Sequence, residues 1–294
     1  MSTTPNAYGN FLGNAAPFVS NYPAIISPWG TYIKPGGRVA AYVRSTGAQD
    51  GEDHFAASGM LVASINEGLK RCRSGQNDIV YVLPGHTEAF SASGAIWANL
   101  VAGAQIIGCG TPGATNAPNI TLSNVGATIA INVANVTICG MNLNTATAAV
   151  TGFLAITAAG FTLAGNSIVN TGTGGANSLI AITGAANCTL AANSIVSDST
   201  SPIISVTGAG STNVVIAGNF IRQAQATGGG ASINVASTAG ISGMVSDNRL
   251  KTATTSTAGV GVFIIGAAAA LTVGNFENYG SDESVAGALL CTGA

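Results

Sequence analysis

The chain has 294 residues, of which only 7% are charged, and a formal net charge of −2. An ordinary soluble domain has roughly 25% charged residues, whereas disordered chains combine little apolar content with high net charge. With 47% hydrophobic residues, the composition excludes a disordered chain. It also argues against nucleic-acid binding, because neutralising phosphates takes a cluster of cations that this sequence lacks.

Charge is absent from the middle of the chain, where no Asp, Glu, Lys, Arg or His lies between Glu88 and Asp198. The most hydrophobic stretch, "VGVFIIGAAAALTV" (260–273), has 14 residues and is too short to cross a bilayer as a helix. No basic region followed by an apolar run opens the chain, so we expect neither a signal peptide nor a membrane partner.

Residues 1–49 are predicted to form an extended arm. They hold five of the nine prolines and sustain no helical or strand period. Proline favours extended chain, and scattered aromatic rings need a surface on which to be buried. Two alternatives stay open, docking on another molecule and folding back on the chain's own body. The candidate anchoring residues are Tyr8, Phe11, Phe18, Tyr22, Trp29 and Tyr32.

The next region, residues 50–78, contains the one helical pattern, over 53–73. Its apolar residues fall near one helical face. Asp50 or Asp53 is expected to cap the start, and Ser74 with Gly75 ends the pattern. A stack of strands has open edges that recruit other chains unless covered, so this helix is placed to cap such a stack.

An internal repeat follows. The stretches "NVTICGMNL" (135–143), "GFTLAGNSI" (160–168), "NCTLAANSI" (187–195) and "NVVIAGNFI" (213–221) align, with weaker copies at 243–250 and 270–278. Aligned from Met141 through the repeated asparagines, the steps are 25, 27, 26, 29 and 27 residues. A second track, such as "ATIAIN" (127–132) and "LIAIT" (179–183), alternates large apolar with small residues, which is typical of strands.

A repeat of 25–29 residues with short strands indicates an all-β solenoid, and a right-handed parallel β-helix over 79–278 fits best. Leucine-rich repeats are the main competitor, but their helical half is missing. Residues 279–294 are predicted to form a C-terminal cap or tail. The repeated asparagines are expected to adopt left-handed backbone geometry and to stack their amides between coils. They are Asn166, Asn193, Asn219, Asn248 and Asn275.

Catalysis on this body is not expected. Glycoside hydrolysis needs two carboxylates facing each other across the bond. The candidates on the body, Asp198 and Asp247, lie nearly two coils apart. We therefore predict no catalytic, cofactor-binding or metal-binding residues and no enzymatic activity.

His86 and Glu88 are predicted to form a structural junction between the helix and the first coil. Their i,i+2 spacing also suits an acid/base pair, and a metal cluster with His54 is the less favoured alternative. Five cysteines without a CxxC motif or neighbouring histidine are expected to be free thiols.

The stretches "ASINEGLKRCRSG" (63–75) and "GQNDIVYVLPGHTEAF" (75–90) resemble virion structural proteins of tailed bacteriophages. The helix followed by "VLPG" also looks like the entry to the β-helix of phage tailspikes and pectate-lyase-like proteins. The resemblance covers at best 50–195. It implies a phage particle component that is trimeric and has no cofactor. The sequence departs from enzymatic tailspikes because it lacks a carboxylate groove.

These observations favour a non-catalytic capsid decoration (cement) protein or head fibre. It would be made in the host cytoplasm, lie on the exterior of the virion and bind the major capsid protein or another virion protein through the arm. Two alternatives stay open. One is a tail fibre or spike that binds bacterial surface glycan, and the other is a polysaccharide depolymerase.

Overall fold

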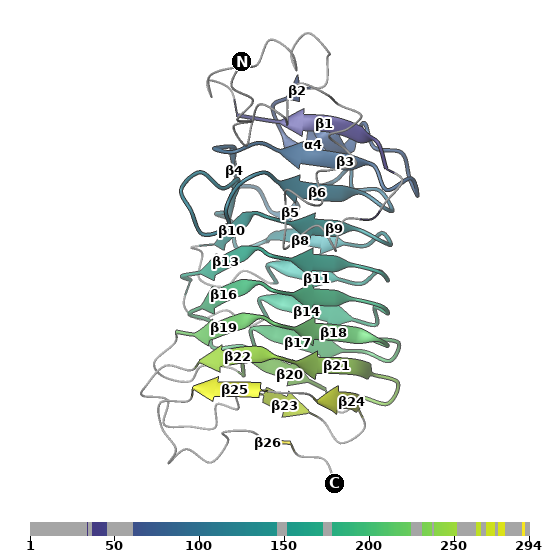
Figure 1. The fold of residues 1–294 in the computed structure, drawn as a ribbon, viewed down its shortest axis with the longest axis vertical. Coiled ribbons are helices and arrows are strands. Elements are labelled where there is room, and N and C mark those ends of the chain that lie inside the picture. The colour runs from purple at the N-terminus through teal and green to yellow at the C-terminus, as the bar shows by residue number, and fades with distance from the viewer. Residues whose placement is uncertain are drawn as a thin grey trace, which may run out of the picture.

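The computed structural model describes residues 34, 37–45, 61–145, 152–172, 178–224, 231–236, 238–251, 263–265, 269–273, 276–279 and 290–291. Within them the chain forms a parallel β-helix of three sheets whose strands stack along one long axis (Figure 1). This confirms the predicted all-β solenoid. Its right-handed sense stays a prediction.

Each full coil contributes one strand to each sheet in turn, and every paired strand is parallel. The first sheet has ten strands in the order β2 (Leu61–Val62), β1 (Val39–Val43), β3 (Ile79–Val82), β6 (Gln105–Gly108), β9 (Thr137–Cys139), β12 (Thr162–Ala164), β15 (Thr189–Ala191), β18 (Val214–Ala217), β21 (Ser242–Ser246) and β24 (Ala270–Val273).

The other two sheets have eight strands each. The second contains β4 (Thr87–Phe90), β7 (Asn119–Leu122), β10 (Asn142–Thr145), β13 (Ser167–Asn170), β16 (Ser194–Ser197), β19 (Phe220–Gln223), β22 (Asn248–Lys251) and β25 (Phe276–Tyr279). The third contains β5 (Gly94–Ala95), β8 (Ala127–Ile131), β11 (Leu154–Ile156), β14 (Ile180–Thr183), β17 (Ile204–Thr207), β20 (Ile233–Val235), β23 (Phe263–Ile265) and β26 (Leu290–Cys291).

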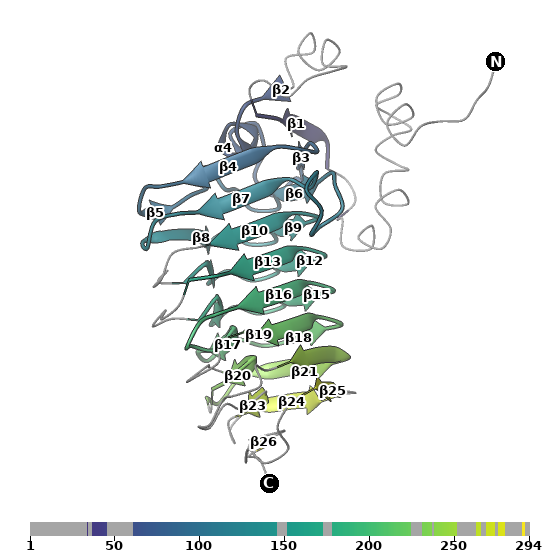
Figure 2. The ribbon, with the colours of Figure 1, turned by 90° about the vertical axis from the view of Figure 1, so that its left-hand side faces the viewer.

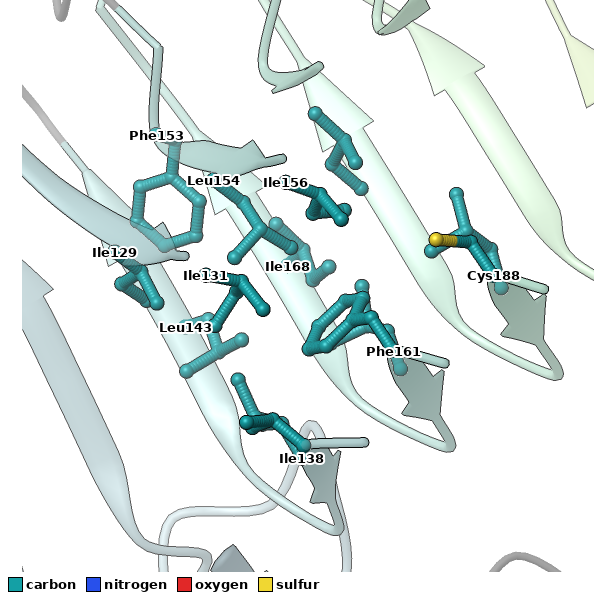
Figure 3. Packing of buried hydrophobic residues seen from close by; sticks show 14 of the residues in the cluster. Ile129, Ile131, Ile138, Leu143, Phe153, Leu154, Ile156, Phe161, Ile168 and Cys188 are labelled. Atoms are coloured by element: carbon teal, nitrogen blue, oxygen red, sulfur yellow. The ribbon is translucent and has the colours of Figure 1, made fainter. Parts of the chain in front are cut away.

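The core fills the space between the three sheets. Alternate residues of each strand point inward, as in β8 and β10, so large aliphatic side chains from successive coils stack in rows. Figure 3 shows Ile131, Leu143 and Ile156, one from each of three strands, directed into this interior. Ile129, Leu154 and Ile180 lie in one register row of the third sheet, which confirms the second repeat track.

The predicted helix over 53–73 is wrong in extent for the part that the structure describes. The helix is α4 (Ile65–Leu69), and Leu61 and Val62 instead form β2, which pairs with β1. Ser64 has extended backbone and its side chain accepts a hydrogen bond from the Glu67 amide, so it caps the helix. Residues 46–60, including both predicted caps, lie outside the described residues.

Helix α4 lies inside the N-terminal end of the stack (Figure 2). Ile65 and Leu69 are fully buried in the core. Gly68 lets the helix approach the sheet closely, because a Cβ there would lie 2.8 Å from the Val80 Cγ1 atom. No helix among the described residues is long and apolar enough to span a membrane.

Both predicted ends of the solenoid extend further than the sequence indicated. Residues 39–43, inside the predicted arm, form β1 and pair with β3, so the expectation of no strand there is wrong. Inside the predicted tail, Leu290 and Cys291 pair with β23 and continue the third sheet.

Candidate functional site

The junction predicted at His86 and Glu88 joins three segments of the N-terminal end. His86 is fully buried, and its Nε2 atom lies 3.1 Å from the Glu88 Oε1 atom. The same carboxylate oxygen accepts a hydrogen bond of 2.5 Å from the backbone N–H of Ile65, the first residue of α4. Glu88 therefore ties the start of the helix to β4 of the second sheet.

Ser45 completes the junction and was not identified from the sequence. Its hydroxyl accepts a hydrogen bond from the Thr87 N–H at 2.8 Å and lies 3.0 Å from the Thr87 carbonyl. It also lies 3.2 Å from Nδ1 of His86. Forty-one residues separate Ser45 from His86, and only the pairing of β1 with β3 brings them together.

Ser45, His86 and Glu88 have the residue types of a nucleophile triad. A catalytic serine needs a hydroxyl free to attack and a base that can meet the substrate. Here the Ser45 hydroxyl bonds both polar groups of the Thr87 backbone, and the imidazole is sealed from solvent. The geometry therefore suits a structural cross-link between β1, β4 and α4.

A second charged cluster lies at the opposite end of β3, around Asp78. Asp78 is fully buried and accepts hydrogen bonds from the Arg73 backbone N–H, Nε and Nη2 at 2.8–3.0 Å. The Arg38 N–H also donates to it, at 3.3 Å. Burial acts to raise the pKa of Asp78. The bonds from Arg73 and Arg38 and the positive charge of Arg73 outweigh it and lower this pKa to about 2.

The repeated asparagines form a continuous buried ladder. Asn166, Asn193, Asn219 and Asn248 are each at most 2% exposed. In every step the Oδ1 atom accepts from the backbone N–H of the corresponding residue one coil earlier, at 3.0–3.1 Å, beginning with Met141. Each Nδ2 group donates to carbonyls of the same or the preceding coil. Asn275 lies outside the described residues.

The left-handed geometry expected for these asparagines is wrong. Positive φ occurs instead at the residue before each ladder position, namely Gly140, Gly165, Ala192, Gly218 and Asp247. That residue turns the corner from the first sheet to the second, which aims the next side chain into the ladder. A different set of asparagines, Asn135, Asn187 and Asn213, has φ between 53° and 63° at another corner.

The two candidate catalytic carboxylates are not brought together. Asp198 follows the last residue of β16, whereas Asp247 precedes the first residue of β22. Strand β19 lies between those two strands in the second sheet. The residues therefore lie at opposite strand ends two coils apart, so the two-carboxylate site has no structural basis.

Cations of the body gather on the outer face of the second sheet. Arg222, Arg249 and Lys251 are the only Lys or Arg residues after Glu88, and all three side chains are exposed. Arg222 pairs in register with Lys251, and Arg249 pairs with half-buried Phe220. Asp247 lies two residues before Arg249 in the chain, and Glu277 of β25 is the register partner of Arg249.

The remaining predicted residues are placed as follows. Cys72, Cys109, Cys139 and Cys188 form no disulfide, as expected, and burial raises the pKa of Cys139 and Cys188. Among the described residues, no group of three His, Cys, Asp or Glu side chains could hold a metal ion. His54 and the anchoring candidates Tyr8, Phe11, Phe18, Tyr22, Trp29 and Tyr32 lie outside the described residues.

Comparison with protein-family models, with curated proteins and with solved structures found no match.

Proposed function

We propose that this protein is a non-catalytic structural component of a bacteriophage particle, a capsid decoration protein or head fibre on the virion exterior. The observation that supports it most is a rigid rod attached to an uncharged, aromatic segment. Hydrogen bonds of buried asparagine amides link each coil of the rod to the next. Residues 1–33 contain six aromatic side chains and no charged side chain.

A rod with an uncharged aromatic segment suits attachment to another protein surface more than catalysis. Burying an aromatic ring on a protein surface is favourable by roughly 25 cal/mol per Å² of apolar area, less the cost of ordering the segment. The outer faces between β7 and β16 present short neutral residues, such as Asn142, Ser167 and Ser194, which suit dense packing on a shell. The partners are then the major capsid protein or another virion protein, with three copies assembling as a homotrimer.

The test is co-sedimentation of purified protein with phage capsids that lack it. Deleting residues 1–33 spares β1 and Lys34, so the body is expected to keep its circular dichroism spectrum while capsid binding is lost. Exchanging Tyr22 and Trp29 for serine in the full chain is expected to weaken capsid binding. Exchanging Asn6 and Asn10 for serine is the control and is expected to leave capsid binding unchanged. Undiminished binding by the deletion variant contradicts the proposed anchor.

The cations on the second sheet support a second candidate, a fibre or spike that binds anionic bacterial surface glycan. Arg222 and Lys251 lie in one register row, about 4.8 Å apart along the axis by strand spacing, beside the ring of Phe220. Cations recognise saccharide carboxylates, and an aromatic face stacks on sugar rings.

This candidate predicts that an Arg222→Gln, Lys251→Gln variant loses at least tenfold affinity for acidic polysaccharide, measured by calorimetry. Thr121→Gln is the matched control, because Thr121 lies in the same outward row at the far end of that face. Equal binding of acidic and neutral glycans, or no binding, contradicts this second candidate.

A further inference from the structure

The His86 ring lies between two partners, and each of them contacts one of its nitrogens. A turn from Leu83 to His86 places it there, with Gly85 at a φ of 77° and the His86 N–H donating to the Leu83 carbonyl at 3.2 Å. The ring is fully buried, with Ser45 at Nδ1 and Glu88 at Nε2. These two contacts decide which ring nitrogens carry a proton.

The Nε2 nitrogen carries a proton. It lies 3.1 Å from the Glu88 Oε1 atom, which also accepts a hydrogen bond from the Ile65 N–H at 2.5 Å. An oxygen of an ionised carboxylate can only accept, so the ring nitrogen has to donate. The other carboxylate oxygen, Oε2, is buried without a partner among the described residues, so a proton placed on it would have no acceptor. The bond from Nε2–H to Glu88 is therefore present whatever the charge of the ring.

The Nδ1 nitrogen has two states, because the Ser45 hydroxyl has a single proton. The Ser45 Oγ atom accepts from the Thr87 N–H at 2.8 Å. It can give its own proton either to Nδ1 of His86, 3.2 Å away, or to the Thr87 carbonyl, 3.0 Å away. A neutral ring takes this proton at Nδ1, because that acceptor is sealed from water whereas Thr87 is exposed. Only one hydrogen bond then links Ser45 to the Thr87 backbone.

A second proton on the His86 ring reverses the direction of this bond. The Nδ1–H then donates to the Ser45 oxygen, and the hydroxyl proton turns to the Thr87 carbonyl. Ser45 now bonds both backbone groups of Thr87, while Nε2–H keeps its bond to Glu88. No polar group of the junction loses its partner, and one hydrogen bond is gained.

The charged groups around the ring are compatible with this second proton. Glu88 is the carboxylate in contact with it. Of the other described segments that meet here, β1, β3 and β7 contain no charged residue, and Arg44 precedes Ser45 in the chain. Helix α4 contains Glu67, whose carboxylate accepts from the Ala63 N–H. A buried charge needs a partner of opposite sign, which Glu88 supplies to the imidazolium.

We propose that His86 is a proton-dependent latch at the N-terminal end of the rod. Strand β4 is the end strand of the second sheet, so Ser45 takes the place of a neighbouring strand at Thr87. Protonation of His86 raises the number of hydrogen bonds between Ser45 and the β4 backbone from one to two. The edge of the sheet is therefore held more tightly in acid than in base, over the pH range in which histidine changes its charge. The latch concerns the free chain and does not depend on a role in a phage particle.

Nuclear magnetic resonance of the ring nitrogens tests the proton assignment. In the full chain labelled with ¹⁵N-histidine, a His54→Asn variant distinguishes His86 from His54, the only other histidine. We expect Nε2 of His86 to carry a proton at both pH 8 and pH 5, and Nδ1 to gain one on acidification. A ring that carries its proton on Nδ1 at pH 8, or that gains none there by pH 5, overturns the latch.

Amide hydrogen exchange tests the effect on β4. The protection factor of the Thr87 amide should be about fivefold higher at pH 5 than at pH 8, as for the gain of one hydrogen bond. Ser45→Ala removes the hydroxyl and should abolish this difference. Ser123→Ala is the matched control, because the Ser123 hydroxyl donates to the Phe90 carbonyl at the other end of β4, and it should leave the difference unchanged.

Equal protection of Thr87 at the two pH values in the parent, or a difference that survives in Ser45→Ala, contradicts the latch. The ring measurement needs no substitution at the junction, so it decides even if Ser45→Ala does not fold. Capsid co-sedimentation is a separate readout, so failure of the latch and failure of the proposed function are distinguishable.

Discussion

The N-terminal end and the middle coils are held together by different chemistry. At the N-terminal end, single side chains such as Asp78 and Glu88 each join segments that are far apart in sequence, through charge-assisted hydrogen bonds. Between Glu88 and Asp198 there is no charged side chain, and neutral amides repeat the same bond from coil to coil. A repeating stack can use the same amide hydrogen bond in every coil. The first coil has no preceding coil to bond with, so it needs hydrogen bonds of its own.

The largest effect is expected from Asn193→Ala in the ladder. The substitution leaves the buried N–H of Asn166 and the Leu163 carbonyl without that partner, at roughly 1–3 kcal/mol for each unsatisfied group. We expect a loss of about 3 kcal/mol in the free energy of unfolding, measured by urea denaturation. The exposed neighbour Ser194→Ala serves as control, within about 0.5 kcal/mol of the parent. Equal losses for the two variants would show that the hydrogen bonds of the ladder do not contribute to the free energy of unfolding.

Asp78→Asn tests the charged cluster around Asp78 at the N-terminal end and should show a pH dependence that the ladder lacks. The pKa of Asp78 is lowered from 3.8 to about 2, so its ionised form stabilises the fold above pH 4. That contribution, about 2 kcal/mol, is lost as the pH falls from 4 through 2. The difference in stability between parent and variant should therefore shrink over this range.

The matched control for that experiment is Asp247→Asn, because Asp247 is exposed and asparagine tolerates its left-handed backbone. We expect a change below about 0.5 kcal/mol at neutral pH. A difference between parent and Asp78→Asn that stays constant from pH 7 to pH 2 would contradict the assigned role of the buried carboxylate.

Glu88→Gln tests whether the N-terminal end can be destabilised locally, without an effect on the middle coils. The neutral amide weakens the bonds to the His86 ring and to the Ile65 N–H, and we expect a loss of about 1 kcal/mol. Amide hydrogen exchange should accelerate at Ile65, while the Asn166 and Asn193 amides keep their protection. Uniform acceleration along the rod would show that junction and coils unfold as one unit.

The smallest expected effect is an increase in the free energy of unfolding. Ala192 holds a φ of 53° at a corner where the equivalent residues Gly165 and Gly218 are glycines. A left-handed conformation costs a residue with a Cβ roughly 1–2 kcal/mol. Ala192→Gly is therefore expected to raise the free energy of unfolding by about 0.5–1 kcal/mol in thermal melts. The control substitution Ala191→Gly, in β15, should lower the free energy of unfolding by about the same amount.

Several residues show where the sequence was a sufficient guide. The period-two alternation in "ATIAIN" and the recurrence of asparagine every 25–29 residues depend on near neighbours and on equivalent positions in adjacent coils. Both the sheets and the amide ladder follow from such patterns. The predicted helix over 53–73 was overextended because Leu61 and Val62 suit a helical face equally well, and pairing with β1 decides between helix and strand.

The sequence by itself determined the solenoid, its repeat length and its ladder, because each coil meets only its neighbours and repeats their hydrogen bonds. Only the tertiary structure decided which residues close the N-terminal end. Ser45 meets His86, and Lys34 meets Gln105, across separations of 41 and 71 residues. No local pattern encodes such contacts, because they exist only once β1 has paired with β3.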